Sequence, residues 1–188
     1  IGGTSAENTA DPVRVYQIWP SKGNVVLFWG LGITGRHPVV LLLILLCAIV
    51  PYWSFVSNTS PEDLFTRSVA FLSIWFVTTI VLVLKVSLSD PGIIPRRSLA
   101  MKLCNRDMSL VDPFSSVINA KFCHTCEIHR PPTASHCVDC DNCVLQFDHH
   151  CAVLNTCVGQ RNYPYFFALM VSVLLYSISF LFQIKFPS

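Results

Sequence analysis

A dense run of cysteine and histidine extends from Cys123 to Cys157. It contains seven of the nine cysteines and five of the six histidines in the chain. The run reads Cys-x2-Cys, nine residues, His-Cys-x2-Cys-x2-Cys, four residues, Asp-His-His-Cys, five residues and a last Cys. Thiolates and imidazoles are preferred zinc ligands, and a thiolate is also a strong nucleophile. The run therefore predicts metal chemistry and thiol chemistry.

The number of ligands predicts two metal sites. Cys123-x-x-Cys126 and Cys137-x-x-Cys140-x-x-Cys143 have chelating spacing. If Cys151 is set aside, six cysteines remain in the run, and two histidines complete two sites of the Cys₃His type. Because the segment is poor in apolar residues, metal binding is the expected source of its stability.

Cys151 ends the sequence Asp148-His149-His150-Cys151 and is the candidate nucleophile. A thiol needs a nearby base near neutral pH, and the base needs an orienting acceptor. One histidine can pair with the thiol and be held by Asp148, while the other binds metal. In the alternative interpretation all four residues are metal ligands and turn residues, and spacing alone leaves both open.

Composition predicts a membrane protein. Of the 188 residues, 52% are hydrophobic and 13% are charged, whereas soluble domains carry about 25% charged residues. Mean hydropathy is +0.52. The net charge of +2 is too small to indicate nucleic-acid binding. No internal repeat or low-complexity tract is evident from the sequence.

Long apolar runs predict three transmembrane helices. The predicted organisation is an N-terminal segment 1–38, span 39–56, connection 57–67, span 68–88, cysteine-rich domain 89–162 and span 163–185. Residues 85–162 hold eight of the 13 Lys and Arg residues. The positive-inside rule predicts that this domain and the N-terminal segment face the cytosol. In that reducing compartment dense cysteines are metal ligands or nucleophiles rather than disulfides.

The cysteine pattern resembles the DHHC domain of protein S-acyltransferases (palmitoyltransferases). Asp90-Pro91-Gly92 after the second span resembles the DPG motif of that family. Further matches are Arg130-Pro131, Asn155, Cys157-Val158-Gly159, Asn162 and Phe166. The resemblance covers about residues 13–186, and the segment 14–19 (RVYQIW) is similar to plant members.

The resemblance implies a role for each residue of the run. Cys151 would be the acyl-accepting nucleophile, His149 its base, and Asp148 the group that orients the histidine. One structural zinc ion would be held by Cys123, Cys126, His136 and Cys143. The other would be held by Cys137, Cys140, His150 and Cys157.

The family also implies an activity and a fold. Cys151 would take a fatty acyl group from acyl-CoA such as palmitoyl-CoA and pass it to a cysteine of a membrane-associated protein, with no nucleic acid involved. The expected fold is an α-helical multi-pass membrane protein with a cytosolic two-zinc domain of short β-hairpins and loops. The expected location is the endomembrane system: the Golgi, the endoplasmic reticulum or the plasma membrane.

The sequence departs from the family in three places. Ala152-Val153-Leu154 replaces the usual Pro-Trp-Val after the nucleophile, and Thr133 stands where Arg is common. The family normally has a fourth span and a Thr-Thr-x-Glu motif, which predicts that this chain is a truncated or splice form or a fragment. The alternative function is a catalytically impaired zinc-binding membrane adaptor.

Overall fold

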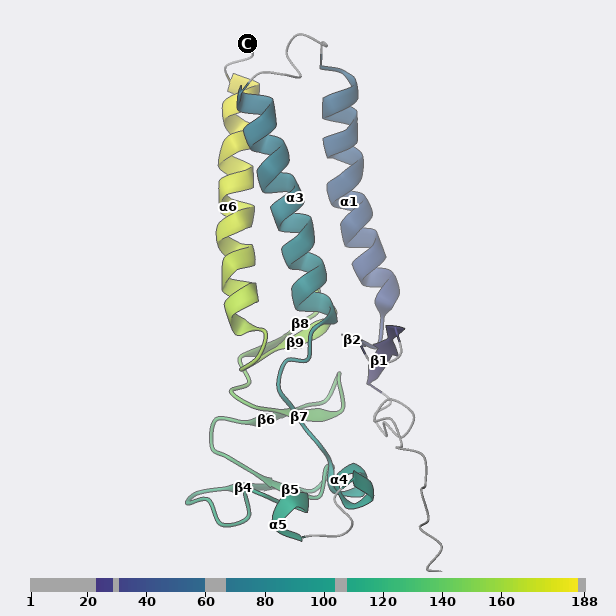
Figure 1. The fold of residues 1–188 in the computed structure, drawn as a ribbon, viewed down its shortest axis with the longest axis vertical. Helices are drawn as coiled ribbons and strands as arrows, with labels where there is room; N and C mark the ends of the chain where they lie inside the picture. The colour runs from purple at the N-terminus through teal and green to yellow at the C-terminus, as the bar shows by residue number, and fades with distance from the viewer. Residues whose placement is uncertain (1–22, 29–30, 60–66, 104–107, 186–188) are drawn as a thin grey trace, which may run out of the picture.

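Three long helices stand side by side, and the short strands and helices lie at one end of them (Figure 1). The computed structural model describes residues 23–28, 31–59, 67–103 and 108–185. The long helices are α1 (Pro38–Ser57), α3 (Arg67–Leu88) and α6 (Tyr163–Lys185). The predicted fold class, three apolar helices with a cysteine-rich domain of short hairpins, is confirmed. The plant-like segment 14–19 and most of the connection 57–67 lie outside the described residues.

The three helices are long and apolar enough to cross a membrane. Their most apolar segments have mean hydropathies of 2.6, 2.3 and 2.1. At 1.5 Å per residue, 20 residues rise about 30 Å, which matches the hydrocarbon core of a bilayer. A helix satisfies its backbone hydrogen bonds internally, which the interior of a bilayer requires.

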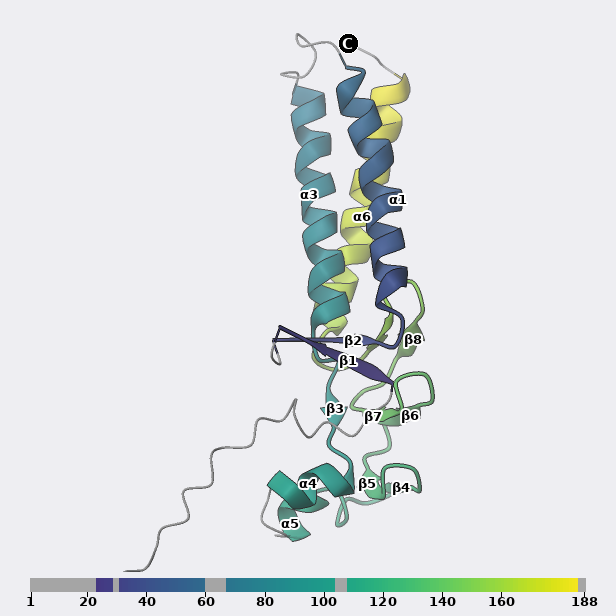
Figure 2. The same ribbon diagram turned by 90° about the vertical axis from the view of Figure 1, so that its right-hand side faces the viewer.

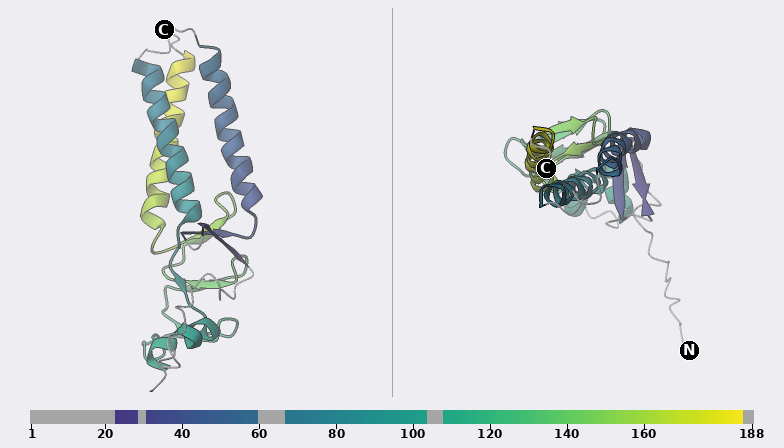
Figure 3. Two further views of the ribbon diagram at one scale, coloured as in Figure 1. Left: turned by 45° about the vertical axis from the view of Figure 1, so that its right-hand side comes forward. Right: turned by 90° about the horizontal axis from the view of Figure 1, so that it is seen from above.

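Helices α3 and α6 pack closely, and α1 contacts them at both ends: Leu41 joins the apolar cluster near the cysteine-rich domain, and Tyr52 makes contacts at the far end. The hydroxyls of Thr79 and Ser172 lie 2.8 Å apart between α3 and α6. Tyr52 of α1 donates a hydrogen bond of 2.6 Å to Ser73, and its ring stacks on Phe76 at 3.8 Å. In the view along the bundle, the three helices occupy the corners of a triangle (Figure 3).

The cysteine-rich domain contains three antiparallel hairpins that follow one another away from the helices (Figure 1). They are β4 (Lys121–Cys123) with β5 (Ile128–Arg130), β6 (Ser135–Cys137) with β7 (Asn142–Val144), and β8 (His149–Cys151) with β9 (Thr156–Val158). The β8–β9 hairpin is nearest to the helices. Strand β3 (Ile93–Ile94) pairs with β7, and the short helices α4 (Arg97–Leu103) and α5 (Met108–Val111) lie at the far end.

Asp90-Pro91-Gly92 joins α3 to this domain. The Asp90 carboxylate accepts hydrogen bonds from the backbone N–H groups of Gly92 and Ile93, both at 2.8 Å, and also from Arg161. Gly92 has φ +107, a conformation that favours glycine. A side chain on Gly159 would lie 2.7 Å from the Pro91 carbonyl oxygen, so a glycine is needed for this close approach.

A further hairpin precedes the first long helix and was not predicted from the sequence. It consists of β1 (Asn24–Leu27) and β2 (Gly32–Gly35). Figure 2 shows that it runs beneath the ends of the long helices, at the level of β8. The sequence signal was weak because the hairpin lies among glycines and has only four residues in each strand.

Candidate functional site

The structure brings the eight predicted ligands together as two groups. Cys123, Cys126, His136 and Cys143 form group 1, and Cys137, Cys140, His150 and Cys157 form group 2. Within each group the candidate ligand atoms all lie within 4.8 Å of one another. The six cysteines are buried, and no disulfide joins cysteines within the described residues.

The geometry of both groups fits zinc. In group 1 the His136 Nδ1 lies 3.7, 3.5 and 3.8 Å from the three sulfurs. In group 2 the His150 Nδ1 lies 3.6, 3.4 and 3.7 Å from its three sulfurs. Zn–S bonds of ~2.3 Å and Zn–N bonds of ~2.1 Å at tetrahedral angles place sulfur and nitrogen about 3.6 Å apart. Each group therefore fits one structural zinc ion with a closed ligand shell.

The close approach of the thiols affects how readily they ionise. A hydrogen bond from the Cys143 thiol lowers the pKa of Cys126 to about 5. The counterpart is that Cys126 and burial raise the pKa of Cys143. In group 2, Cys137 raises the pKa of Cys140 to about 12, and Cys137 and Cys140 raise the pKa of Cys157. Several buried thiolates repel one another, and a divalent cation removes that repulsion.

The two groups are copies of one pattern, so the sequence interpretation that found no internal repeat was wrong. Each ligand of group 2 lies 14 residues after its counterpart in group 1. In each group one hairpin supplies a Cys-x-x-Cys pair, and the next hairpin supplies a His and a Cys directly opposite each other. The turn residues Glu127, Asp141 and Asn155 follow the same spacing and all have φ between 51 and 55. The cysteine spacing alone could have revealed this repeat.

The repeat explains why Cys151 remains outside both groups. Cys151 stands in the third hairpin where Cys123 and Cys137 stand in the first two. We call the Cys-x-x-Cys turn of each hairpin a knuckle. In the third hairpin Leu154 takes the position of the second knuckle cysteine, which is Cys126 in the first hairpin and Cys140 in the second. Leu154 is buried among apolar residues of α1, α3 and α6, with Cys151 packed against the same cluster. The third hairpin therefore retains the backbone of a metal knuckle but lacks its second thiol.

Alternation along β8 separates the metal from the free thiol. Successive side chains of a strand point to opposite faces. His150 faces Cys157 and the metal group. His149 and Cys151 therefore share the other face, where the His149 ring lies 5.3 Å from that of Phe166 in α6. The Asp148 carboxylate lies 3.6 Å from the His149 Nδ1, so the acid is paired with an imidazole on the face of β8 that also carries the free thiol.

An apolar pocket of about 390 Å³ extends from Cys151 between the three long helices. This is within the usual range of about 300–1,000 Å³ for small-molecule sites. Its walls carry no charged side chain; they are formed by Ile44, Leu45, Ala48, Thr79, Ile80, Val83, Cys151, Val153, Leu154, Phe166, Leu169, Met170 and Val173. Seen along the bundle, the β8–β9 hairpin lies across the space between α6 and α1 (Figure 3). Cys151 therefore borders an apolar cavity between the long helices.

The N-terminal hairpin holds the loop that follows Cys151. Asn155, buried and with φ 51, accepts a hydrogen bond of 2.5 Å at its carbonyl oxygen from the Gly35 N–H. Its side-chain oxygen accepts another of 3.2 Å from the His37 N–H, and its amide donates to the Thr34 hydroxyl at 3.3 Å. The sequence indicated Asn155 but not these partners, because they lie about 120 residues earlier.

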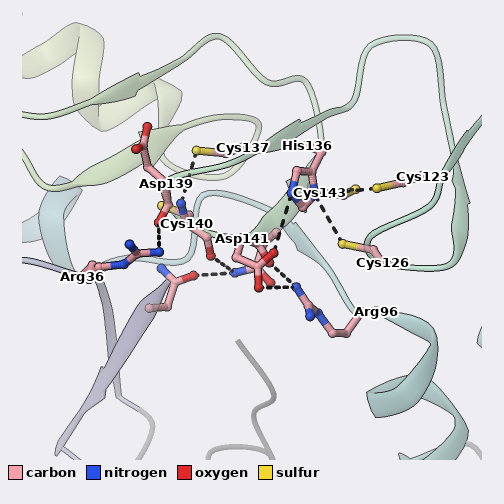
Figure 4. Close-up of polar contacts among 12 residues, drawn as sticks. Arg36, Arg96, Cys123, Cys126, His136, Cys137, Asp139, Cys140, Asp141 and Cys143 are labelled. Atoms are coloured by element: carbon pink, nitrogen blue, oxygen red, sulfur yellow. Dashed lines mark hydrogen bonds and ion pairs between the residues drawn. The ribbon is translucent and has the colours of Figure 1, made fainter. Parts of the chain in front are cut away.

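Two histidines that lie farther from the helices, His136 and His129, are each paired with an aspartate. The Asp141 Oδ1 lies 3.7 Å from the His136 Nε2, and its Oδ2 lies 3.0 Å from Arg96, as Figure 4 shows. Asp112 pairs with His129 at 2.7 Å. This contact ties His129 of β5 to the buried Asp112 of the segment after α5.

Comparison with known proteins agrees with this site. Residues 116–186 match the family model of the DHHC palmitoyltransferase. The chain is 41% identical over 112 residues to palmitoyltransferase erf2 of Schizosaccharomyces pombe, covering 53% of this chain and 32% of that protein. It is 33% identical over 176 residues to palmitoyltransferase ERF2 of Candida glabrata, covering 85% and 54%. It is 37% identical over 126 residues to palmitoyltransferase ZDHHC9 of Homo sapiens, covering 57% and 35%.

Residues 116–186 of the chain thus carry a DHHC palmitoyltransferase domain. The resemblance identified from the cysteine run is thus confirmed. The chain spans 32%, 54% and 35% of the lengths of the three relatives.

The first prediction concerns Asp141, which orients a candidate zinc ligand. Asp141→Asn should weaken zinc binding about 10–100-fold, because partners of ligating histidines fix the ring and raise its basicity. Zinc retention against a graded chelator measures this. Asp139→Asn is the matched control, because among the described residues the Asp139 carboxylate forms no ion pair with a histidine, and only its backbone oxygen accepts a hydrogen bond from Arg36. Equal retention in the two variants would contradict the role of Asp141.

The second prediction tests the third knuckle. Leu154→Cys restores the missing thiol of the repeat, so the variant should bind cadmium beyond the two ions held by groups 1 and 2. Metal content and the ultraviolet absorption of thiolate–cadmium bonds measure this. Leu154→Ser has no thiol and should bind no additional cadmium, and neither should Leu154→Cys combined with Cys151→Ser. An unchanged stoichiometry in Leu154→Cys would show that the third hairpin lacks knuckle geometry.

Proposed function

We propose that the chain is a protein-cysteine S-acyltransferase that uses acyl-CoA as the donor and Cys151 as the nucleophile. One observation carries this proposal. Cys151 lies at an apolar pocket between three membrane-length helices, while the six other cysteines between 123 and 157 belong to metal groups. The three relatives are named palmitoyltransferases.

The first half-reaction loads the enzyme. The Cys151 thiol gives its proton to His149, and its sulfur attacks the thioester carbon of acyl-CoA. The tetrahedral intermediate collapses with loss of the CoA sulfur, which receives the proton from His149. Asp148 stabilises the imidazolium and keeps the ring oriented, as its carboxylate 3.6 Å from the His149 Nδ1 allows. The products are acyl-Cys151 and CoA.

The second half-reaction transfers the acyl group. A cysteine thiol of a membrane-associated protein attacks the acyl-Cys151 carbonyl carbon, gives its proton through His149, and releases the Cys151 thiol. The number of thioester bonds is conserved, so no further reactant is needed. This two-step covalent route has ping-pong character.

The pocket supplies the binding energy for the acyl chain. Burial of each methylene contributes about 0.8 kcal/mol, so a chain of 16 carbons gains roughly 10 kcal/mol before entropic costs. The two zinc ions are structural in this proposal: they cross-link the hairpins and hold β8 so that Cys151 faces the pocket. The proposed orientation places the zinc domain in the cytosol, where acyl-CoA is present, in a membrane of the endomembrane system.

Acyl-enzyme formation tests the proposal. Purified chain incubated with labelled palmitoyl-CoA should acquire a label that hydroxylamine removes. Cys151→Ser should abolish the label and keep about two zinc ions, because Cys151 belongs to neither metal group. Cys47→Ser, at an exposed cysteine of α1, is the matched control and should label normally.

Two results would contradict these assignments. Loss of zinc in Cys151→Ser would make that cysteine a ligand. Absence of label in the parent chain with two zinc ions bound would favour the adaptor function.

Cys137→Ser should lose metal and lower the thermal unfolding midpoint, since structural zinc binding is coupled to folding.

A further prediction concerns the preferred length of the acyl chain. Ala48 lines the pocket from α1, so Ala48→Phe should shorten the pocket and shift the preference from palmitoyl-CoA to shorter donors. Each methylene excluded from the pocket should cost about 0.8 kcal/mol, roughly fourfold in affinity. Competition between acyl-CoAs of different length in the loading assay measures the shift. Leu46→Phe, at an exposed position of α1 outside the pocket, should leave the preference unchanged.

A further inference from the structure

The tip of the β1–β2 hairpin exposes large apolar side chains. Leu31 is 88% exposed, the highest value among the large hydrophobic residues that the structure describes, and Phe28 is 61% exposed. Phe28 has φ 50, an unfavourable conformation for a large side chain. Its carbonyl oxygen accepts a hydrogen bond of 3.3 Å from the Leu31 N–H, which closes the turn. Exposed apolar side chains on a closed turn indicate a surface that contacts something other than water.

This tip lies against the outer surface of α3. A groove of about 360 Å³ is bordered by Leu31 and by residues of α3 and the residue that follows it: Val81, Leu84, Lys85, Leu88 and Ser89. The groove therefore extends over about two turns of the helix. Figure 2 shows the hairpin directly below the end of α3 from which the zinc domain begins.

Lys85 indicates the level of the membrane surface in this region. It lies near the end of an otherwise apolar helix, and its ammonium group is 5.2 Å from the centre of the Tyr165 ring in α6. Lysine and tyrosine at the end of a membrane-length helix place their polar groups among the lipid headgroups. Val81 and Leu84 lie on the bilayer side of Lys85, so the groove begins at headgroup level and continues toward the acyl chains.

We propose that the β1–β2 hairpin is a membrane-surface anchor. Phe28 and Leu31 insert into the interfacial region of the leaflet on the zinc-domain side, and an acyl chain of a bordering phospholipid occupies the groove between Leu31 and α3. The occupant is lipid because the groove continues the exposed apolar surface of a helix that is itself long enough to cross the bilayer. Removal of Leu31 and Phe28 from water is favourable in this position.

The anchor has a consequence for the third hairpin. Gly35 and Thr34, at the other end of β2, are hydrogen-bonded to Asn155. A hairpin held in the membrane surface therefore fixes the loop after Cys151 at a set depth. The insertion itself does not depend on the proposed acyl transfer, and its test does not use acylation.

Depth-dependent quenching tests the insertion. An environment-sensitive fluorescent amino acid replaces Leu31 in the full chain, which is reconstituted in nanodiscs of phosphatidylcholine brominated at shallow acyl positions. The emission of the probe at position 31 should be shifted to the blue relative to a probe exposed to water. Its intensity should be lower in the brominated nanodiscs than in unbrominated ones. Ile118 is the matched control position, because it is 84% exposed and lies before β4, at the far end of the zinc domain. Equal quenching at 31 and 118 would overturn the proposal.

Photo-crosslinking distinguishes the occupants. A benzophenone amino acid at position 31 should give phospholipid adducts by mass spectrometry in native membranes. A crosslinked dimer of the chain, or a protein adduct in place of lipid, would overturn the assignment of the groove to lipid. Retention of about two zinc ions per chain shows that each substituted protein is folded, and exposed Leu31 contributes little core packing.

Discussion

The alternation of side chains along β8 is the constraint on which the site depends. His150 and Cys157 lie opposite each other and face a metal group, so His149 and Cys151 must face the other way. One strand of three residues thus separates a structural metal site from a free thiol. A shift of one residue in the register would exchange the two faces, directing Cys151 toward the metal and His150 toward the helices. Metal binding therefore stabilises the domain and also fixes which way the thiol points.

The domain uses one hairpin design three times and changes it once. Two hairpins carry a complete Cys-x-x-Cys knuckle, and each following hairpin completes the ligand set with a His and a Cys. In the third hairpin Leu154 replaces the second thiol and packs with Leu41, Val83 and Leu169 of the long helices. The same substitution therefore frees Cys151 and attaches its hairpin to the bundle. Since the hairpins follow one another away from the helices, the altered one is also the one closest to them.

Links distant in sequence hold this third hairpin against the bundle. Asp90 ties the end of α3 to Arg161, and Asn162 binds the Cys157 carbonyl and the Gly159 N–H at the start of α6. On the other side Asn155 joins the loop after Cys151 to the start of α1 and to the β1–β2 hairpin. All three long helices are thus connected to the β8–β9 hairpin, which carries Cys151. Hydrogen bonds to the backbone, rather than apolar packing alone, set the position of the thiol relative to the pocket.

The sequence by itself determined the three apolar helices, the cysteine-rich domain and a number of ligands sufficient for two metal sites, because hydrophobic length and ligand spacing are local properties. The grouping of the eight ligands followed from the family resemblance. The sequence also contained the 14-residue repeat, which the initial interpretation missed. The roles of Asp148, His149 and Cys151 remain proposals. Only the tertiary structure revealed the β1–β2 hairpin, the partners of Asn155, the pairing of Asp112 with His129, and the pocket beside Cys151. These features join segments as many as 120 residues apart or arise from packing between helices, and spacing within a single segment carries no record of such contacts.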